Sequence, residues 1–167
     1  NVVNLEALNS SLRDEGVHVL SQCDAESILV VLSRELIRIR PSGHTTADLV
    51  TAIGTLFERV RGGYTVVAAM EVDGVETLVA FRDPNGVRPG VFGQRSDGAW
   101  MVASESVALD VTGFKRTGDI PPGSIVIFRN GTEPVTHQIT DQPTRHCVFE
   151  RIYFARPDSM MEDGRIN

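Results

Sequence analysis

Residues 64–82 of the chain read YTVVAAMEVDGVETLVAFR, two runs rich in β-branched residues on either side of the dipeptide Asp73-Gly74. Asp-Gly between such runs is a strong signal for a tight hairpin, because both residues tolerate a positive φ. Two further pairs of β-rich runs flank Asp97-Gly98 and Asn130-Gly131. The pattern predicts about six strands in largely antiparallel sheets. The expected strands cover residues 64–71, 76–82, 91–95, 99–104, 124–129 and 133–140.

The sequence before this hairpin has helical periodicity, with apolar residues three and four positions apart. Three helices are expected: one between Asn4 and Gly16, one from the capping-box-like residues 21–24 to Pro41, and one from Thr45 or Thr46 to Gly62. Helices that precede a set of hairpins, instead of alternating with strands, indicate an α+β fold with helices packed on antiparallel sheets.

The composition is that of a globular protein that folds as one domain. The chain has 167 residues, of which 41% are hydrophobic and 23% charged, and its formal net charge is −6. A negative net charge argues against a general nucleic-acid binder, because phosphate neutralisation requires a basic surface. No apolar run is long enough for a membrane span, and two cysteines are too few for a disulfide framework. A cytoplasmic location is therefore expected.

Residues 81–90 (FRDPNGVRPG) form the most distinctive loop of the sequence, with the proline and glycine residues of tight turns. Its charged residues Arg82, Asp83 and Arg88 either brace the loop as ion pairs or bind an anion. The bracing role is favoured, because charges that brace a loop are more frequent than charges that bind a ligand.

Two other segments combine strand residues with charge. Residues 101–106 (MVASES) end a strand, with Ser104 as the expected N-cap and Glu105 in the first turn of a short helix over 105–110. Residues 149–159 (FERIYFARPDS) mix aromatic and charged side chains. A half-buried strand at a domain boundary and the lining of a binding cleft would both have this pattern, and the residues alone leave both open.

The sequence contains no local motif for a metal ion, a nucleophile or a phosphate loop. His146 and Cys147 are adjacent, but Cys23 is far away and no zinc-ligand spacing occurs. None of the four histidines lies in a nucleophile motif, although a catalytic triad can assemble in space. No glycine-rich phosphate loop is present. A metal site within this chain is not expected.

Three segments taken together resemble the amidophosphoribosyltransferase family: residues 80–89 (AFRDPNGVRP), 101–110 (MVASESVALD) and 153–159 (YFARPDS). They occur in the family's order and spacing, and the likeness runs from Asn1 to about Ser159. The resemblance implies two linked activities. A glutaminase of the N-terminal-nucleophile type releases ammonia from glutamine. A phosphoribosyltransferase adds it to phosphoribosyl pyrophosphate, which gives 5-phosphoribosylamine in the first step of de novo purine synthesis.

The resemblance also implies how this chain is organised. Residues 1–145 would be the later part of the glutaminase domain, an αββα sandwich of largely antiparallel sheets with helices outside. Residues 146–167 would begin the connection to a phosphoribosyltransferase half that these residues do not include. The start at Asn1 likewise predicts a piece of a longer protein. Glutamine, the missing half and further copies of the parent are the expected partners, with no nucleic acid and no membrane.

The family's nucleophile has no counterpart in this chain. The mature family enzyme begins with a cysteine whose own α-amino group acts as the base. Residue 1 here is asparagine, which has neither thiol nor hydroxyl, and Asn1 resembles the last residue of the family's His-Asn-Gly-Asn oxyanion stretch. No catalytic residue is therefore assigned, and the isolated chain is expected to be inactive.

Asp24, Tyr153 and Cys147 match functional residues of the family. Asp24 corresponds to the aspartate that holds the α-amino group of glutamine, and a plain helix-capping carboxylate is the alternative interpretation. Tyr153 corresponds to a tyrosine at the interface of the two active sites, associated with the ammonia passage. Cys147 is in register with the first of four cysteines that hold a [4Fe–4S] cluster in one branch, although cluster-free members also have cysteine there.

No cofactor is expected for this chain itself. In a full-length parent, the resemblance implies Mg²⁺ together with phosphoribosyl pyrophosphate and, in the cluster-bearing branch, the iron–sulfur cluster. Two other interpretations stay open. One is a non-catalytic remnant or interaction module with a glutaminase-like fold. The other is a fragment of another class-II glutamine amidotransferase, such as one that feeds sugar amination, and residues 81–89 and 153–159 argue against it.

Overall fold

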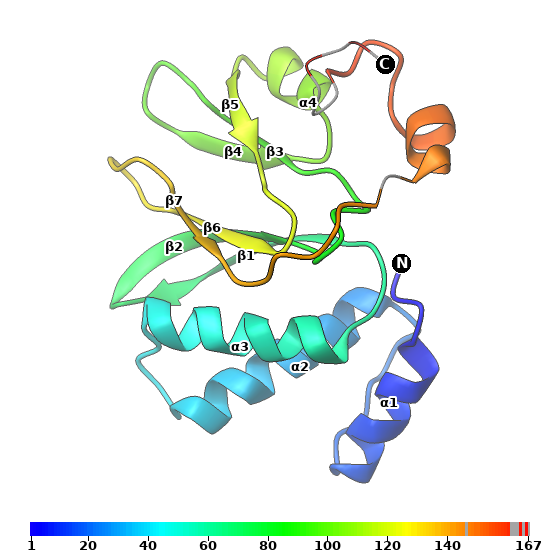
Figure 1. Cartoon of the computed structure of the whole chain (residues 1–167). Helices are drawn as coiled ribbons and strands as arrows, with labels where there is room; N and C mark the ends of the chain where they lie inside the picture. Colours follow the sequence, from blue (N-terminus) through cyan, green and yellow to red (C-terminus); the bar gives the residue numbers. More distant parts are fainter. Residues whose placement is uncertain (146, 161–163, 165, 167) are drawn as a thin grey trace. The chain divides into compact units, whose positions relative to one another are not determined.

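The computed structural model describes residues 1–145, 147–160, 164 and 166, and the chain divides into two compact units. The first, called the helical unit below, consists of Asn1–Gly63 together with Glu71–Val75. The second, called the sheet unit, consists of Tyr64–Met70 and Glu76–Asn167. The elements of both units are labelled in Figure 1.

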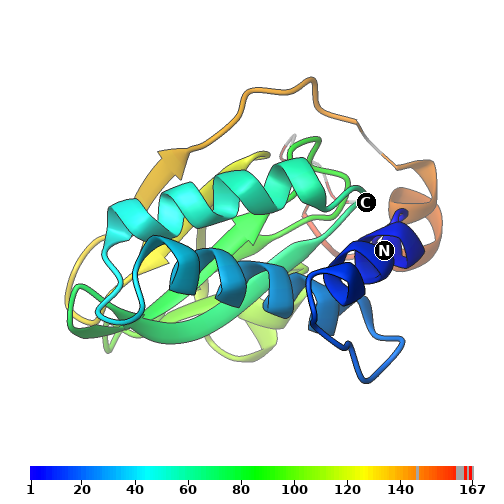
Figure 2. The same ribbon diagram turned by 90° about the horizontal axis from the view of Figure 1, so that it is seen from below.

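Three amphipathic helices build the helical unit: α1 (Leu5–Asp14), α2 (Asp24–Ile39) and α3 (Thr46–Arg59). The helices α2 and α3 lie side by side and pack against each other (Figure 2). Each buries one apolar stripe, as the helical periodicity predicts. The buried apolar residues are Leu8 and Leu12 in α1, Ile28, Val31, Leu32 and Leu36 in α2, and Leu49, Ala52, Ile53 and Leu56 in α3.

The starts of α2 and α3 differ in how their free backbone N–H groups are satisfied. At α3 the predicted start is confirmed as a capping box, in which the Asp48 N–H donates to Thr45 Oγ1 at 3.2 Å and the Thr45 N–H donates to Asp48 Oδ2 at 2.9 Å. The hydrogen bonds from Thr45 lower the pKa of the Asp48 carboxyl. The predicted capping box over residues 21–24 is wrong: Cys23 is the N-cap, and Ser21 hydrogen bonds to Glu26 instead.

The sheet unit contains two antiparallel sheets, with strand orders β1-β2-β6-β7 and β4-β3-β5. The predicted Asp73-Gly74 turn is confirmed, with φ values of 55° and 74°. The fold is therefore α+β with largely antiparallel sheets, as predicted. The strands are β1 (Thr65–Val72), β2 (Val75–Arg82), β3 (Val91–Gln94), β4 (Trp100–Ala103), β5 (Lys115–Asp119), β6 (Ser124–Phe128) and β7 (Val135–Gln138).

Two helical segments complete this unit, and they differ from the sequence-based expectation in detail. The helix α4 (Ser106–Val111) has Glu105 as its N-cap, so the prediction of Ser104 at that position is wrong by one residue. The segment η1 (Glu150–Phe154) is a short π-helix, which excludes a strand there. Among the described residues, no helix is both long and apolar enough to cross a bilayer.

An aromatic cluster joins the two sheets face to face. Phe128 of β6 packs edge-on against Phe92 of β3, with ring centroids 5.3 Å apart, and lies 5.8 Å from Trp100 of β4. Ala80 and Val126 from the first sheet belong to the same buried cluster. The inner faces of the two sheets therefore share one apolar core, which is the geometry of a β-sandwich.

Replacing the central ring of this cluster tests its importance. Phe128 is 2% exposed, so Phe128→Ala leaves a cavity and is expected to lower the free energy of unfolding by about 3–5 kcal/mol. Urea denaturation followed by tryptophan fluorescence measures the change. Val135→Ala on β7 is the control, because Val135 is 53% exposed and its truncation should cost less than about 0.5 kcal/mol. Equal losses in both variants would contradict a core shared by the two sheets.

Candidate functional site

The loop after β2 is organised around a buried carboxylate. Asp83 has 0% exposure, and both of its oxygens accept hydrogen bonds from backbone amides. Oδ1 accepts from Asn85 and Val87, each at 3.1 Å, and Oδ2 accepts from Tyr64 at 3.2 Å and Arg88 at 3.3 Å. Four N–H donors replace the water that this charge loses on burial. Burial and, secondarily, the nearby Asp83 carboxylate raise the pKa of the Tyr64 hydroxyl.

Arg82 braces the same loop together with Asp83, and the contacts of these two side chains are called the Asp83 brace below. Its guanidinium is buried, with 2% exposure of the residue, and donates to the carbonyl oxygens of Gly86 at 2.7 Å and Ile120 at 3.1 Å. Its Nε donates to the carbonyl oxygen of Arg88. These contacts confirm the bracing role of Arg82 and Asp83, because their polar atoms are directed at the backbone of the loop and of the adjoining residues Tyr64 and Ile120.

The outer end of this loop reaches the aromatic segment near the end of the chain. The guanidinium of Arg88 lies over the ring of Phe154, 4.6 Å from its centroid. A cation at this distance from an aromatic face is attracted by the negative potential of the ring. Two of the segments that carry the family resemblance, 80–89 and 153–159, are therefore in contact within the sheet unit.

The third segment contacts the same part of the chain. Glu105 Oε2 accepts a hydrogen bond from the backbone N–H of Arg156 at 2.9 Å and another from the Ser159 hydroxyl at 2.8 Å. Ser106 Oγ accepts from the N–H of Met160 at 2.8 Å. Residues 105 and 106 are thus joined to residues 156–160 by two bonds from main-chain amides and one from a side-chain hydroxyl, across 51 to 54 positions of sequence. No local signal in the sequence indicated these contacts.

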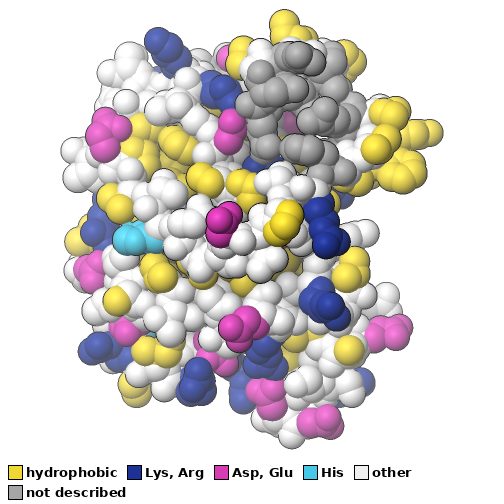
Figure 3. Space-filling view, in the orientation of Figure 1, with side chains coloured by type: hydrophobic (Ala, Val, Ile, Leu, Met, Phe, Trp, Pro, Cys, Tyr) yellow, Lys and Arg dark blue, Asp and Glu magenta, His cyan; other side chains and the backbone are white. Residues whose placement is uncertain are grey.

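An exposed apolar surface lies beside these contacts, on and around η1. Five side chains between positions 148 and 154 are more than half exposed: Val148, Phe149, Ile152, Tyr153 and Phe154. In Figure 3 hydrophobic side chains gather over this segment. Tyr153 has the highest exposure of the five, 78%, and its ring lies 6.4 Å from that of Phe149. Such a concentration of exposed aromatic residues is typical of a surface that a partner covers.

Asp24 lies in the helical unit, at the first residue of α2. Its Oδ2 accepts a hydrogen bond from the Val2 N–H at 3.1 Å and lies 3.8 Å from the α-ammonium nitrogen of Asn1. The side chain is 35% exposed, so it is accessible as well as paired. Asn1 is held in turn by its N–H donation to the Gly63 carbonyl at 2.7 Å. The carboxylate therefore faces the main-chain nitrogens of residues 1 and 2.

The glycine at position 62 makes this arrangement of the chain start possible. Val2 pairs with Gly62 in an antiparallel bridge, and Gly62 has a φ of 137°. A Cβ atom at this position would lie 2.2 Å from the carbonyl oxygen of Asn1. Only glycine therefore allows residues 1 and 2 to approach so closely and to bring their nitrogens to Asp24.

The described residues do not fit an iron–sulfur cluster. Cys147 is a free, half-buried thiol, and Cys23 is free and exposed in the other unit. Within the described ranges, no group of three or more His, Cys, Asp or Glu side chains is arranged to hold a metal ion. His146, which precedes Cys147, lies outside the described residues. A single thiol supplies one of the four ligands that a cluster requires.

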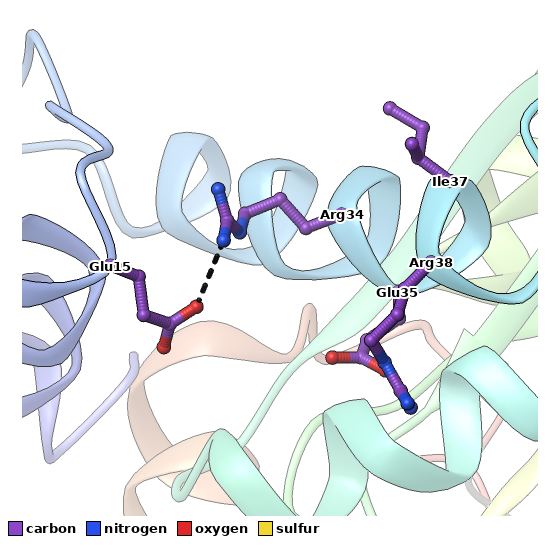
Figure 4. Close-up of a pocket in the computed structure, with 5 residues that line it drawn as sticks. All are labelled: Glu15, Arg34, Glu35, Ile37 and Arg38. Atoms are coloured by element: carbon purple, nitrogen blue, oxygen red, sulfur yellow. Dashed lines mark hydrogen bonds and ion pairs between the residues drawn. The ribbon is translucent and has the colours of Figure 1, made fainter.

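A cavity of about 320 Å³ lies in the helical unit, and Asp24 is not among the residues that line it (Figure 4). Its lining is strongly charged, but Glu15 pairs with Arg34 at 3.3 Å and Glu35 pairs with Arg38 at 2.7 Å. A ligand would have to displace these ion pairs before it could bind. The cavity therefore carries no functional assignment.

Comparisons with known proteins agree with the three-segment resemblance. A scan against models of protein families finds no match. The amidophosphoribosyltransferases of Pseudomonas aeruginosa and Escherichia coli are 40% and 37% identical to this chain, each over 97% of its length. The chain is similar to amidophosphoribosyltransferases along almost all of its length. It spans only about one third of these relatives, 33% in both cases.

The fold comparison leads to the same enzymes. The glutamine phosphoribosylpyrophosphate amidotransferase of B. subtilis, solved with ADP and GMP, superposes with a TM-score of 0.76 at 30% identity. The match covers 98% of this chain and 33% of that one. A second solved structure, described as the allosteric regulatory enzyme of purine biosynthesis, gives the same TM-score at 29% identity.

The Asp83 brace leads to a prediction about stability. Asp83→Asn turns an NH₂ group toward backbone N–H donors and removes the charge that they stabilise. We expect the free energy of unfolding to fall by about 3 kcal/mol or more. Thermal and urea unfolding measure the loss. Asp97→Asn is the matched control, since Asp97 lies on an exposed turn beside Arg95 and should change stability little. A variant of Asp83 as stable as the wild type would refute the brace.

Proposed function

We propose that residues 1–167 are a piece of an amidophosphoribosyltransferase that contains the later part of its glutaminase domain and the start of the link that follows. This enzyme transfers ammonia from glutamine to phosphoribosyl pyrophosphate and gives 5-phosphoribosylamine, the first step of de novo purine synthesis. The observation that carries the proposal is the 40% identity to the Pseudomonas aeruginosa enzyme over 97% of this chain. The antiparallel β-sandwich and the TM-score of 0.76 to the B. subtilis enzyme support it.

Asp24 is proposed to bind the α-amino group of glutamine. The support is its position at the first residue of α2, where the helix terminus favours negative charge, and its partial exposure. A carboxylate that already accepts a backbone N–H can also form a charge-assisted hydrogen bond with the α-ammonium group of a free amino acid.

Residues 1–145 are proposed to be the later part of the glutaminase domain, and residues 146–167 the start of the link to the phosphoribosyltransferase half. The exposed apolar side chains between 148 and 154 would be covered by that half, with Tyr153 at the junction and near the ammonia passage. Mg²⁺ would accompany phosphoribosyl pyrophosphate there. The parent is proposed to be a cytoplasmic homo-oligomer.

The 167-residue chain by itself is expected to release no glutamate from glutamine. The family resemblance places the nucleophilic cysteine outside residues 1–167, and glutamine hydrolysis requires that nucleophile. The measurement is a coupled glutamate assay on the purified chain, with a catalytically competent class-II glutaminase as the positive control. Glutamate release above the buffer blank that scales with chain concentration would contradict this expectation.

The intact protein that contains these residues tests the proposed reaction directly. With [amide-¹⁵N]glutamine and phosphoribosyl pyrophosphate it should form ¹⁵N-labelled phosphoribosylamine and pyrophosphate. Asp24→Asn should raise KM for glutamine by about tenfold or more, since a charge-assisted contact to the α-ammonium is weakened. The ammonia-dependent rate should be unchanged.

Asp14→Asn is the control for this substitution, because Asp14 is an exposed aspartate in the same helical unit at the end of α1. Its KM for glutamine should equal that of the wild type. Absence of labelled product from the wild-type protein would overturn the proposed function. An unchanged KM in Asp24→Asn would overturn only the role of Asp24.

A further inference from the structure

Glu105 occupies the N-cap position of α4, yet its side chain makes no capping hydrogen bond to that helix. An N-cap side chain ordinarily satisfies a free N–H of its own first turn. Here the carboxylate accepts instead from the backbone N–H of Arg156 at 2.9 Å and from the Ser159 hydroxyl at 2.8 Å. Its hydrogen-bonding capacity is thus used on a distant segment and not on the local helix.

The next residue repeats this pattern. Ser106 is 4% exposed, and its hydroxyl oxygen accepts from the Met160 N–H at 2.8 Å. Ser159, which donates to Glu105, is 3% exposed. Two consecutive side chains therefore accept hydrogen bonds from donors at three positions of residues 156–160, and two of the side chains involved, Ser106 and Ser159, are buried. These two residues are called the Glu105–Ser106 anchor below.

The hydrogen bond from Arg156 to the anchor comes from its main chain. The Arg156 guanidinium forms a fork with Asp158, with Nε–Oδ1 at 3.0 Å and Nη2–Oδ2 at 3.2 Å. The hydrogen bonds that Arg156 donates to Asp158 raise the pKa of the guanidinium and lower the pKa of the Asp158 carboxyl. Glu105 contacts the main chain of Arg156, so the anchor fixes the path of the backbone.

A second contact holds the other end of the same segment. Phe154 lies under the guanidinium of Arg88, whose backbone N–H is bound by the buried Asp83. Residues 154–160 are therefore fixed at one end by the braced loop and at the other by the Glu105–Ser106 anchor. The exposed aromatic side chains of Phe149 and Tyr153 lie just before this doubly held stretch.

We propose that Glu105 and Ser106 are positioning residues that fix residues 154–160, and with them the exposed surface around η1, for nitrogen transfer. This inference rests on the proposed function, in which that surface meets the half of the enzyme that accepts ammonia. If residues 154–160 were free to move, the exposed surface would adopt many orientations. Ordering it would then cost conformational entropy each time ammonia is transferred.

Hydrogen–deuterium exchange of the intact protein tests the contacts themselves. In Glu105→Ala the Arg156 amide should exchange at least tenfold faster, and in Ser106→Ala the Met160 amide should do so. Glu105→Gln, which keeps an oxygen at the same position, should give an intermediate rate. Glu133→Ala is the control, because Glu133 is an exposed glutamate in the turn before β7 and should change neither rate. Wild-type exchange at Arg156 in Glu105→Ala would overturn the anchor.

The transfer ratio tests the positioning role. It is the amount of ¹⁵N-phosphoribosylamine formed for each glutamate released. Glu105→Ala should lower this ratio at least threefold while KM for glutamine stays unchanged, and Glu105→Gln should restore much of it. A purely structural role would lower the melting temperature without changing the ratio, and that result would overturn the proposal. No transfer by the wild-type protein would refute the proposed function itself, and the exchange rates would then decide whether the anchor exists.

Discussion

The buried carboxylate of Asp83 is the constraint on which the rest of the sheet unit depends. A charge with 0% exposure is costly unless hydrogen bonds replace its lost hydration, and four backbone amides do so here. Its own backbone carbonyl accepts the amides of Gly86 and Gly123 as well. The loop must therefore keep one conformation. That conformation holds Arg88 where its side chain contacts Phe154.

The sequence was sufficient to identify the helices, the strands and the three distinctive segments, but it did not predict the contacts between those segments. Alternating apolar residues and Asp-Gly or Asn-Gly turns are local signals, so the three helices and six of the seven strands could be predicted. The bracing role of Arg82 and Asp83 was favoured because such charges brace a loop more often than they bind a ligand. Contacts such as Glu105 to Ser159 join positions 54 residues apart, and only tertiary folding determines them.

The local errors also have physical causes. Strand β5 reads KRTGD, without apolar alternation, and it pairs with β3 through a register shift at Phe92 and Gly93. A Cβ at Gly93 would lie 2.6 Å from the Lys115 carbonyl oxygen, so this close approach depends on a missing side chain. Ser104 was favoured as a cap by residue type alone. Glu105 takes the N-cap position, but its side chain accepts a hydrogen bond from Arg156 and not from the first turn of α4. Residue preferences at the N-cap do not include such competing long-range hydrogen bonds.

The arrangement of rigid and exposed parts in the sheet unit favours a docking role over a self-sufficient binding site. Exposing Phe149, Ile152 and Tyr153 to water costs free energy that nothing in the described residues recovers. The backbone that follows them is nevertheless fixed by a cation–π contact and by side chains of two other segments. Holding an apolar surface in one orientation reduces the entropy that a partner must remove on binding. If a further part of the same enzyme covers this surface, its burial recovers the free energy that its exposure costs.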